Sequence, residues 1–219
     1  MSAQACAAPR RIALTVGDPN GIGPEIVLKA LAEIERMANE GALPRDRLPK
    51  ITVFGAASVL ERAADATATG HGWRRLDLRE AGHIAPAAHR PGQVCAEAGA
   101  SAIDAASAAI RACQAGEFDA VVAGPHHETA IHLAGIAFSG YPSLLARVCG
   151  QHEQSVFLML VGGGLRIVHV TLHESVASAL ARLTPDLIVQ ATRAGVTACE
   201  RLGIAQARVG LFGINPHAS

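Results

Sequence analysis

Aromatic side chains and unbalanced charge are both scarce in this chain of 219 residues. Phe, Trp and Tyr make up 3% of it, and 19 basic residues balance 19 acidic ones, so the formal net charge is +0. It has no basic block and no basic-aromatic stripe of the kind that attracts nucleic acids, which argues against a nucleic-acid partner. No apolar run approaches the ~18 residues of a membrane span, and residues 1–11 hold no apolar segment of a secretory signal. We therefore expect a soluble, cytoplasmic protein with no membrane partner.

Sequence motifs that depend on cysteine are also absent. The five cysteines are Cys6, Cys95, Cys113, Cys149 and Cys199, and no two of them form a Cys-x-x-Cys pair. Their odd number and wide spacing indicate neither a disulfide framework nor a thiolate zinc site. A Gly-x-Ser-x-Gly elbow is absent too, so nothing points to a serine or cysteine nucleophile.

Apolar runs that alternate with helical patterns are abundant, and hydrophobic residues make up 50% of the chain, enough for a substantial core. The periodicity predicts strands over 11–16, 50–55, 118–123, 156–160, 165–171 and 208–214. It predicts helices over 24–38, 57–66, 98–115, 174–183 and 185–202. The runs at 156–160 and 165–171 flank three glycines and are expected to form a hairpin. This order is typical of an α/β fold with a largely parallel sheet and helices on both faces.

Three histidine-bearing segments directly follow predicted strands. The first, at 124–132, contains His126, His127, Glu128 and His132; the others contain His173 and His217. Ligands of open α/β sheets bind at the carboxyl ends of the strands, and neutral imidazole is the commonest metal ligand in proteins. Two interpretations stay open: a shared metal site, or separate loop histidines that are solvated or hydrogen-bonded.

A glycine-rich loop over 17–25 joins the first predicted strand to the first predicted helix. It lacks both the G-x-G-x-x-G spacing of dinucleotide sites and the Lys-Ser/Thr of a P-loop. It is either a tight strand-to-helix connection or an anion-binding loop at a helix N-terminus. From the residues alone, we expect an α/β protein with a histidine-rich crevice for a divalent metal and an anionic small molecule.

Three segments, read together, resemble a known family. Residues 17–25, residues 124–125 with 134–140, and residues 215–218 resemble signatures of the 4-hydroxythreonine-4-phosphate dehydrogenase family, in the family's order. Within it, residues 125–132, 138–145 and 169–176 are most similar to members that act on a cis-dihydrodiol dicarboxylate of terephthalate degradation. The resemblance implies an isocitrate- or isopropylmalate-dehydrogenase-like fold and a homodimer with active sites at the subunit interface. It also implies NAD as hydride acceptor, a divalent metal that is often zinc, and a small carboxylate substrate.

The resemblance also assigns residues to roles. It implies that His173 is a metal ligand and that His127 and Glu128 are substrate-contacting and catalytic residues, with His126 and Tyr141 beside them in the substrate site. Tyr141 stands where phosphate-handling members carry a metal-binding His, and Glu128 stands where many carry Lys. The loss of a cation argues against a phosphorylated substrate.

The resemblance covers the N-terminal two-thirds or so of the family fold. We therefore expect a continuation after Ser219 that carries the third metal ligand and much of the NAD site. We expect a lobe boundary near 71–92 or 124–140. The function predicted is NAD-dependent, metal-assisted oxidative decarboxylation of the dihydrodiol to protocatechuate. The alternatives are a 4-hydroxythreonine-4-phosphate dehydrogenase of pyridoxal phosphate synthesis, or a truncated family member without activity.

Overall fold

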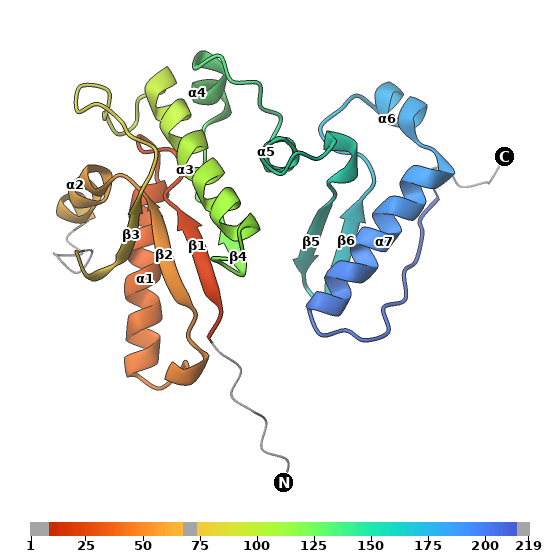
Figure 1. Ribbon diagram of the computed structural model, residues 1–219, viewed down its shortest axis with the longest axis horizontal. Coiled ribbons are helices and arrows are strands. Elements are labelled where there is room, and N and C mark those ends of the chain that lie inside the picture. Colours follow the sequence, from red (N-terminus) through yellow and green to blue (C-terminus); the bar gives the residue numbers. More distant parts are fainter. Residues whose placement is uncertain (1–8, 68–73, 214–219) are drawn as a thin grey trace, which may run out of the picture. The chain divides into compact units, whose positions relative to one another are not determined.

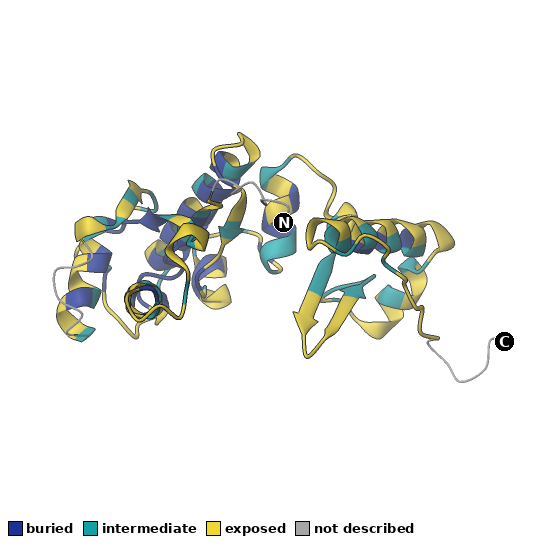
Figure 2. Ribbon diagram, turned by 90° about the horizontal axis from the view of Figure 1, so that it is seen from below, coloured by how far each residue is buried: buried dark blue, intermediate teal, exposed yellow. Residues whose placement is uncertain are grey.

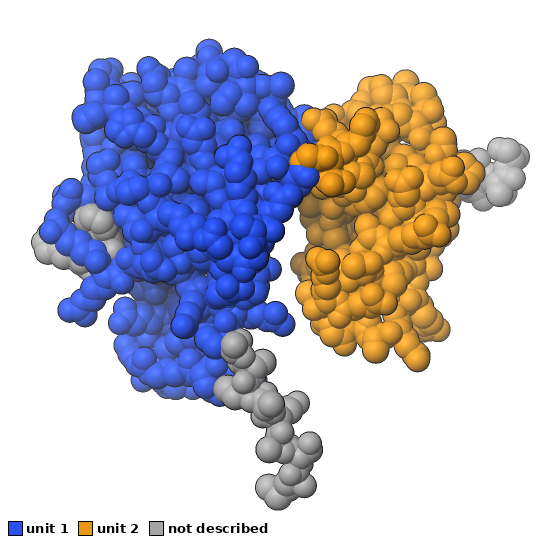
Figure 3. Space-filling view, viewed as in Figure 1, with its two compact units in different colours: residues 1–149 blue, residues 150–219 orange. Residues whose placement is uncertain are grey.

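The computed structural model describes residues 9–67 and 74–213, and the chain divides into two compact units, 1–149 and 150–219 (Figure 3). Both ranges expected for a lobe boundary, 71–92 and 124–140, lie inside unit 1. The division of the whole family fold into lobes stays a prediction.

Unit 1 is built on a four-stranded parallel sheet in the order β3-β2-β1-β4 (Figure 1). Its elements are β1 (Arg11–Thr15), α1 (Gly23–Asn39), η1 (Arg45–Arg47), β2 (Lys50–Gly55), α2 (Ala57–Thr67), β3 (Asp77–Glu80), α3 (Ala96–Gln114), β4 (Ala120–Val122), α4 (Glu128–Leu133) and α5 (Tyr141–Val148). The parallel α/β fold predicted from the sequence is confirmed.

Side chains that alternate along β2 show how the helices cover both faces of this sheet. Val53 packs with Leu28 of α1 and Leu60 of α2, whereas its neighbour Phe54 packs with Ala109 of α3. This is the period-two pattern of a strand buried on both faces. The faces are therefore covered by α1 and α2 on one side and by α3 on the other.

Helices α4 and α5 pack against α3 and continue the core beyond the sheet. Ile103 and Ile110 of α3 contact a cluster that includes Ile131 of α4 and Leu144 of α5. At Gly99 a Cβ atom would lie 2.2 Å from the carbonyl carbon of Ala130, so α3 and α4 approach more closely than any other residue would allow. This close packing fixes the segment that follows β4.

Unit 2 is smaller and has a thinner core. It contains η3 (Glu153–Ser155), β5 (Leu158–Gly162), β6 (Leu165–His169), α6 (Val176–Arg182) and α7 (Pro185–Arg201). The predicted hairpin is confirmed, since β5 and β6 are antiparallel. Within 150–213 only Leu187, Ala191 and Gly195 are buried, all on α7 (Figure 2).

One strand was not predicted, and one predicted strand is wrong. The edge strand β3 is absent from the predicted strands, and it pairs with β2 although Leu78 is its only apolar residue. Residues 208–213 of the predicted last strand form no strand, and Phe212 is 98% exposed. A strand needs a neighbour for its backbone groups, and no described strand pairs with this segment.

Candidate functional site

The carboxyl ends of β1 and β4 bring two loops together in unit 1. Because Leu14 of β1 pairs with Val122 of β4, the loop at 16–22 lies beside the loop at 123–127. The Asp18 N–H donates a hydrogen bond to the Pro125 carbonyl over 2.8 Å. The glycine-rich loop and the histidine-rich turn, which are far apart in sequence, therefore form one structure at the edge where ligands bind.

Glycines make this close approach of the backbones feasible. Gly17 has φ +74°, and a Cβ atom on it would lie 2.1 Å from the Pro125 carbonyl oxygen. A Cβ atom on Gly23 would lie 2.0 Å from the Val16 carbonyl oxygen. Of the two interpretations of the loop, these contacts support the tight strand-to-helix connection.

Asp18 lies in the middle of this junction and is 4% exposed. Its Oδ1 accepts a hydrogen bond from the Asn20 N–H over 2.8 Å. Burial raises the pKa of the Asp18 carboxyl, although the Asn20 N–H bond and the charges of His127 and His126 act in the opposite direction. The cost of burying the charged form of Asp18 is therefore only partly offset by its hydrogen bond and by the nearby imidazoles.

Asn20, also 4% exposed, anchors a distant segment to the loop. Its side-chain amide donates to the carbonyls of Ala88 and Gln93, each over 3.0 Å, and its Oδ1 accepts from the Arg90 N–H over 2.8 Å. The neighbouring His89 is buried, and burial is the main cause that lowers its pKa, followed by the charge of Arg62. One side of the candidate site is thus held by residues 88–93.

His126 sits in an aromatic cluster on the other side. Its ring makes edge-to-face contacts with Phe138 and Tyr141, with centroid distances of 4.7 Å and 4.9 Å. Burial lowers the pKa of His126, while the carboxylates of Glu128 and Asp18 act to raise it. The neutral ring is therefore favoured, as suits an imidazole packed between aromatic rings.

Tyr141 and His132 both use their polar atoms within the protein. The Tyr141 hydroxyl donates to the Gly124 carbonyl over 2.8 Å, and burial raises the pKa of this phenol. His132 Nε2 is 2.8 Å from the Phe138 carbonyl oxygen. These two residues hold the turn after β4 in place.

His127 and Glu128, in contrast, are exposed where α4 begins. His127 is the residue before the helix and Glu128 is its first residue. Glu128 acts to raise the pKa of the half-buried His126, and His127 acts to lower the pKa of the buried Asp18. The structure thus brings together four of the five predicted site residues: His126, His127, Glu128 and Tyr141. Of these, His127 and Glu128 are exposed and accessible to a ligand.

His173 belongs to unit 2, in the segment between β6 and α6. It is exposed and is the only non-glycine residue of the described chain with positive φ, at 49°. His217 lies outside the described residues. Across the ranges 9–67 and 74–213, no three His, Cys, Asp or Glu side chains are grouped closely enough to hold a metal ion.

The donors of unit 1 therefore do not fit the metal site implied by the resemblance. A phenol binds a metal as phenolate. The Tyr141 hydroxyl is instead protonated and donates a hydrogen bond to the Gly124 carbonyl. His173 is left as the one described residue assigned to the metal.

Sequence reasoning found the histidines but missed Asp18, Asn20 and Phe138. Asp18 and Asn20 lie in the loop at 17–25, which is interpreted from its sequence as a glycine-rich connection or anion-binding loop and as a family signature, without a role for either side chain. The spacing Asp-x-Asn is a signal for a side chain that hydrogen-bonds its own backbone two residues on. Nothing in the sequence signals that Asn20 bonds to residues 88–93.

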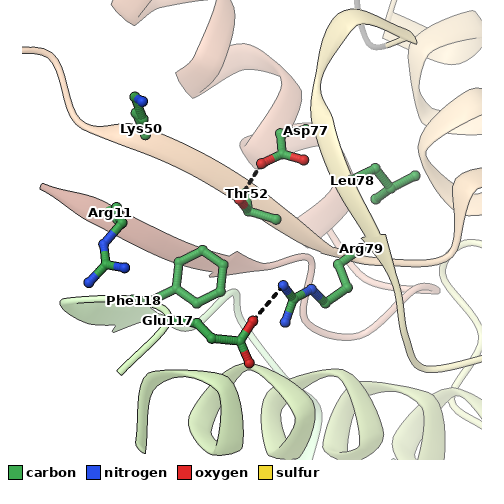
Figure 4. A pocket seen from close by; sticks show the side chains of 8 residues that line it. All are labelled: Arg11, Lys50, Thr52, Asp77, Leu78, Arg79, Glu117 and Phe118. Atoms are coloured by element: carbon green, nitrogen blue, oxygen red, sulfur yellow. Dashed lines mark hydrogen bonds and ion pairs between the residues drawn. The ribbon is translucent and has the colours of Figure 1, made fainter. Parts of the chain in front are cut away.

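A cavity of about 310 Å³ lies elsewhere, at the amino ends of the strands (Figure 4). Its charged residues are largely paired, since Arg79 binds Glu117 over 2.8 Å and Asp77 accepts from the Thr52 hydroxyl over 2.5 Å. The sticks in Figure 4 show both bonds lying across its wall. None of the predicted site residues lines it, and ligands of parallel sheets bind at the opposite edge.

Comparisons with known proteins place the chain in a family. Residues 47–219 match the family described as pyridoxal phosphate biosynthetic protein PdxA. The chain belongs to this family. The matched region of this PdxA-family chain contains the histidine-rich turn, Tyr141 and His173. Among the described residues, no helix is long and apolar enough to cross a membrane.

Its relatives in the PdxA family are named as dehydrogenases. A 1,2-dihydroxy-3,5-cyclohexadiene-1,4-dicarboxylate dehydrogenase from Comamonas sp is 57% identical, over 96% of this chain and 64% of that protein. A 4-hydroxythreonine-4-phosphate dehydrogenase from Maricaulis maris is 36% identical, over 94% of this chain and 64% of that protein. The chain thus spans just under two thirds of the length of these curated relatives.

Solved structures of the same two kinds of dehydrogenase also match the chain. The crystal structure of a terephthalate 1,2-cis-dihydrodiol dehydrogenase from Burkholderia xenovorans LB400 matches with a TM-score of 0.68 and 42% identity, over 96% of this chain and 63% of that chain. A 4-hydroxythreonine-4-phosphate dehydrogenase from Burkholderia phymatum matches with a TM-score of 0.74 and 30% identity, over 96% of this chain and 64% of that chain.

Proposed function

We propose that this chain forms the substrate-binding part of an NAD-dependent dehydrogenase that converts a cis-dihydrodiol dicarboxylate to protocatechuate. The observation that carries the proposal is the Glu128 carboxylate, which is exposed at the start of α4 directly after His126 and His127. Many family members carry Lys at this position, and the loss of that cation disfavours a phosphate group, while a carboxylate accepts hydrogen bonds from the hydroxyls of a diol. The 57% identity with the Comamonas enzyme named for this substrate supports the same choice.

The proposed chemistry assigns a proton transfer to His127. When the secondary alcohol of the diol is oxidised to a ketone, the His127 imidazole accepts the hydroxyl proton, and a bound NAD would accept the hydride from the carbinol carbon. The product is a β-keto acid, because the neighbouring ring carbon carries a carboxylate. Loss of carbon dioxide and protonation of the enolate oxygen then give the aromatic catechol acid, protocatechuate. Glu128 accepts a hydrogen bond from the diol, and His126 and Tyr141 form the wall beside it.

NAD and a divalent metal, zinc in our expectation, are the cofactors of this proposal, and His173 is its metal ligand. NAD supplies a hydride acceptor when it is bound. Because the described residues do not form a complete metal site, no step is assigned to the metal. Removal of the His173 imidazole in a His173→Ala variant is expected to lower the zinc content, and an unchanged content would remove this role.

We further propose that the chain acts in the cytoplasm as a homodimer. The hairpin in unit 2 supports an interface between copies, since Leu160, Leu165 and Ile167 on one of its faces are 50%, 64% and 47% exposed. Exposed apolar patches of this kind mark interaction surfaces. Sedimentation of a Leu160→Glu/Ile167→Glu variant tests this, and a dimer that persists would contradict it.

The decisive experiment compares substrates. NADH formation is followed with the cis-dihydrodiol dicarboxylate and, in parallel, with 4-phosphohydroxythreonine. Turnover of the diol alone is expected. Turnover of the phosphate ester alone would overturn the proposal in favour of the activity named for the Maricaulis relative.

NAD titration by calorimetry separates a third outcome, a chain that binds acid but turns nothing over. Binding of NAD supports the dehydrogenase. Absence of both NAD binding and turnover would favour a non-catalytic family member.

A further inference from the structure

The cavity at the amino ends of the strands lies on the face of the sheet that packs against α3. Ala13 of β1 and Phe54 of β2 share a core cluster with residues of that helix. Side chains alternate along a strand, so Arg11 is on the same face as Ala13, and Lys50 and Thr52 are on the same face as Phe54. The cavity of about 310 Å³ is therefore open on this face, at the end of the sheet opposite to the histidine-rich turn.

Two of the three cations that line the cavity have partners within the protein. Arg79 pairs with Glu117 over 2.8 Å, and its guanidinium lies over the ring of Phe118, 5.4 Å from the centroid. Arg11 pairs with Asp119 over 3.2 Å. The charges of these two arginines are thus already balanced by neighbouring carboxylates.

The remaining two charges of the lining have no partner of opposite sign. Lys50 is the cross-strand neighbour of Arg11, an arrangement of like charges that is unfavourable by itself. Asp77 accepts a hydrogen bond from the Thr52 hydroxyl over 2.5 Å. None of the ion pairs formed within 9–67 and 74–213 includes Lys50 or Asp77. One ammonium and one carboxylate therefore line the same cavity without neutralising each other.

The register of the strands separates these two charges. Asp77 pairs with Thr52, and Lys50 precedes Thr52 by two residues along β2. With a rise of about 3.3 Å per residue and about 4.8 Å between strands, the Cα atoms of Lys50 and Asp77 are about 8 Å apart. Figure 4 shows the ring of Phe118 near the middle of the labelled side chains. A ligand that balances both charges must itself carry two charges of opposite sign, joined by a short apolar stem.

We propose that this cavity binds a short zwitterion, an ω-amino acid with a few methylene groups between its ammonium and its carboxylate. The ligand's carboxylate pairs with the Lys50 ammonium, its ammonium pairs with the Asp77 carboxylate, and its stem packs against Phe118. Small-molecule sites begin at about 300 Å³, so the cavity has the volume for such a ligand. The site lies outside the dehydrogenase site and does not depend on the proposed function.

The first test compares three ligands with stems of similar length: 4-aminobutyrate, butyrate and butylammonium. Each is titrated at constant ionic strength into the 219-residue chain, and binding is followed by amide NMR shifts. We expect 4-aminobutyrate to bind with a Kd on the order of 1 mM, with shifts confined to the residues around the cavity. Butyrate and butylammonium should bind at least about five-fold more weakly, because each can form only one of the two ion pairs.

The second test removes one charge of the protein at a time. Lys50→Gln and Asp77→Asn are each expected to weaken 4-aminobutyrate binding about five-fold, and the Asn side-chain carbonyl still accepts from the Thr52 hydroxyl. Lys50→Gln should leave the binding of butylammonium unchanged. Lys29→Gln and Asp104→Asn are the matched controls, since both residues are exposed on helices and outside the cavity, and they should bind all three ligands as wild type does.

Three results would overturn the inference: no binding of 4-aminobutyrate to wild type, equally tight binding of butyrate, or an unchanged Kd in both Lys50→Gln and Asp77→Asn. The ligand comparison uses wild type alone, so it stays decisive if a variant fails to fold. Neither test needs turnover. A chain that binds the zwitterion but oxidises no diol would contradict the proposed function only, and a chain that oxidises the diol without binding the zwitterion would contradict this inference only.

Discussion

The Pro125 carbonyl oxygen lies 2.1 Å from the point that a Cβ atom on Gly17 would occupy. Gly17→Ala therefore combines a clash between two backbones with a left-handed φ of +74°. We expect this variant to lose about 3 kcal/mol of unfolding free energy, measured by urea denaturation.

Gly41 provides the control for Gly17. It has nearly the same φ, +76°, but a Cβ atom on it would meet nothing within 4 Å. Gly41→Ala should cost only about 1 kcal/mol, the conformational part alone. Equal losses of unfolding free energy in the two variants would show that the close contact between Gly17 and Pro125 does not affect stability.

The Asn20 side chain joins the glycine-rich loop to residues 88–93. Asn20→Ala removes bonds to the carbonyls of Ala88 and Gln93 and to the Arg90 N–H, and leaves these groups without partners. The expected loss of unfolding free energy is about 2–4 kcal/mol. Amide hydrogen exchange at Arg90 should also accelerate, because its acceptor is gone.

Asn39 at the end of α1 serves as the comparison, since its side chain is exposed and accepts a hydrogen bond from the exposed Arg45. Asn39→Ala is expected to change stability by less than about 0.5 kcal/mol. If Asn20→Ala were equally mild and left exchange at Arg90 unchanged, residues 88–93 would have to be held by other contacts.

The sequence predicts elements well where local pattern and packing agree. The strand β2 has the predicted bounds, and α7 begins after Thr184, whose hydroxyl accepts from the Leu187 N–H as an N-cap does. The strand β3 escaped notice because only Leu78 in it is apolar, so pairing with β2, not side-chain pattern, makes it a strand. Residues 208–213 show the reverse case, a strand-like pattern without a described partner.

The residues of the candidate site show the same contrast between local sequence pattern and long-range packing. Histidines after predicted strands were found from composition and order, since parallel strands end at one edge. Asp18 and Asn20 were not found, because burial gives Asp18 its unusual charge environment and Asn20 bonds to residues about 70 positions away. Contacts of this range depend on the assembled sheet and leave no mark on the local sequence.

Tyr141 stabilises the turn after β4 through its hydroxyl. Tyr141→Phe removes the bond to the Gly124 carbonyl, and we expect it to cost about 1 kcal/mol in unfolding free energy. Because burial raises the pKa of the phenol, the group is protonated at neutral pH and unsuited to a metal. Zinc content, measured by mass spectrometry, should therefore be unchanged in Tyr141→Phe, whereas it should fall in His173→Ala. Loss of zinc on Tyr141→Phe would make the tyrosine a ligand.

Burial of His126 should make stability depend on pH in a defined direction. Its pKa is lowered in the folded chain from the ordinary value of 6.5, so the unfolded chain binds the proton more readily. The unfolding free energy must then fall as pH drops below about 6.5, until the lower folded pKa is passed. His89, whose pKa is also lowered by burial, contributes with the same sign.

Urea denaturation at pH 7.5 and pH 5 checks this dependence. His126→Phe keeps an aromatic ring between Phe138 and Tyr141 but cannot be protonated, so its loss of stability between the two pH values should be smaller than that of wild type, with the His89 part remaining. Phe138→Leu disturbs the same cluster without removing a titratable group, and it should lower stability by a similar amount at both pH values. An equal pH dependence in wild type and His126→Phe would mean that the imidazole is solvated in the folded chain, which its contacts with both aromatic rings argue against.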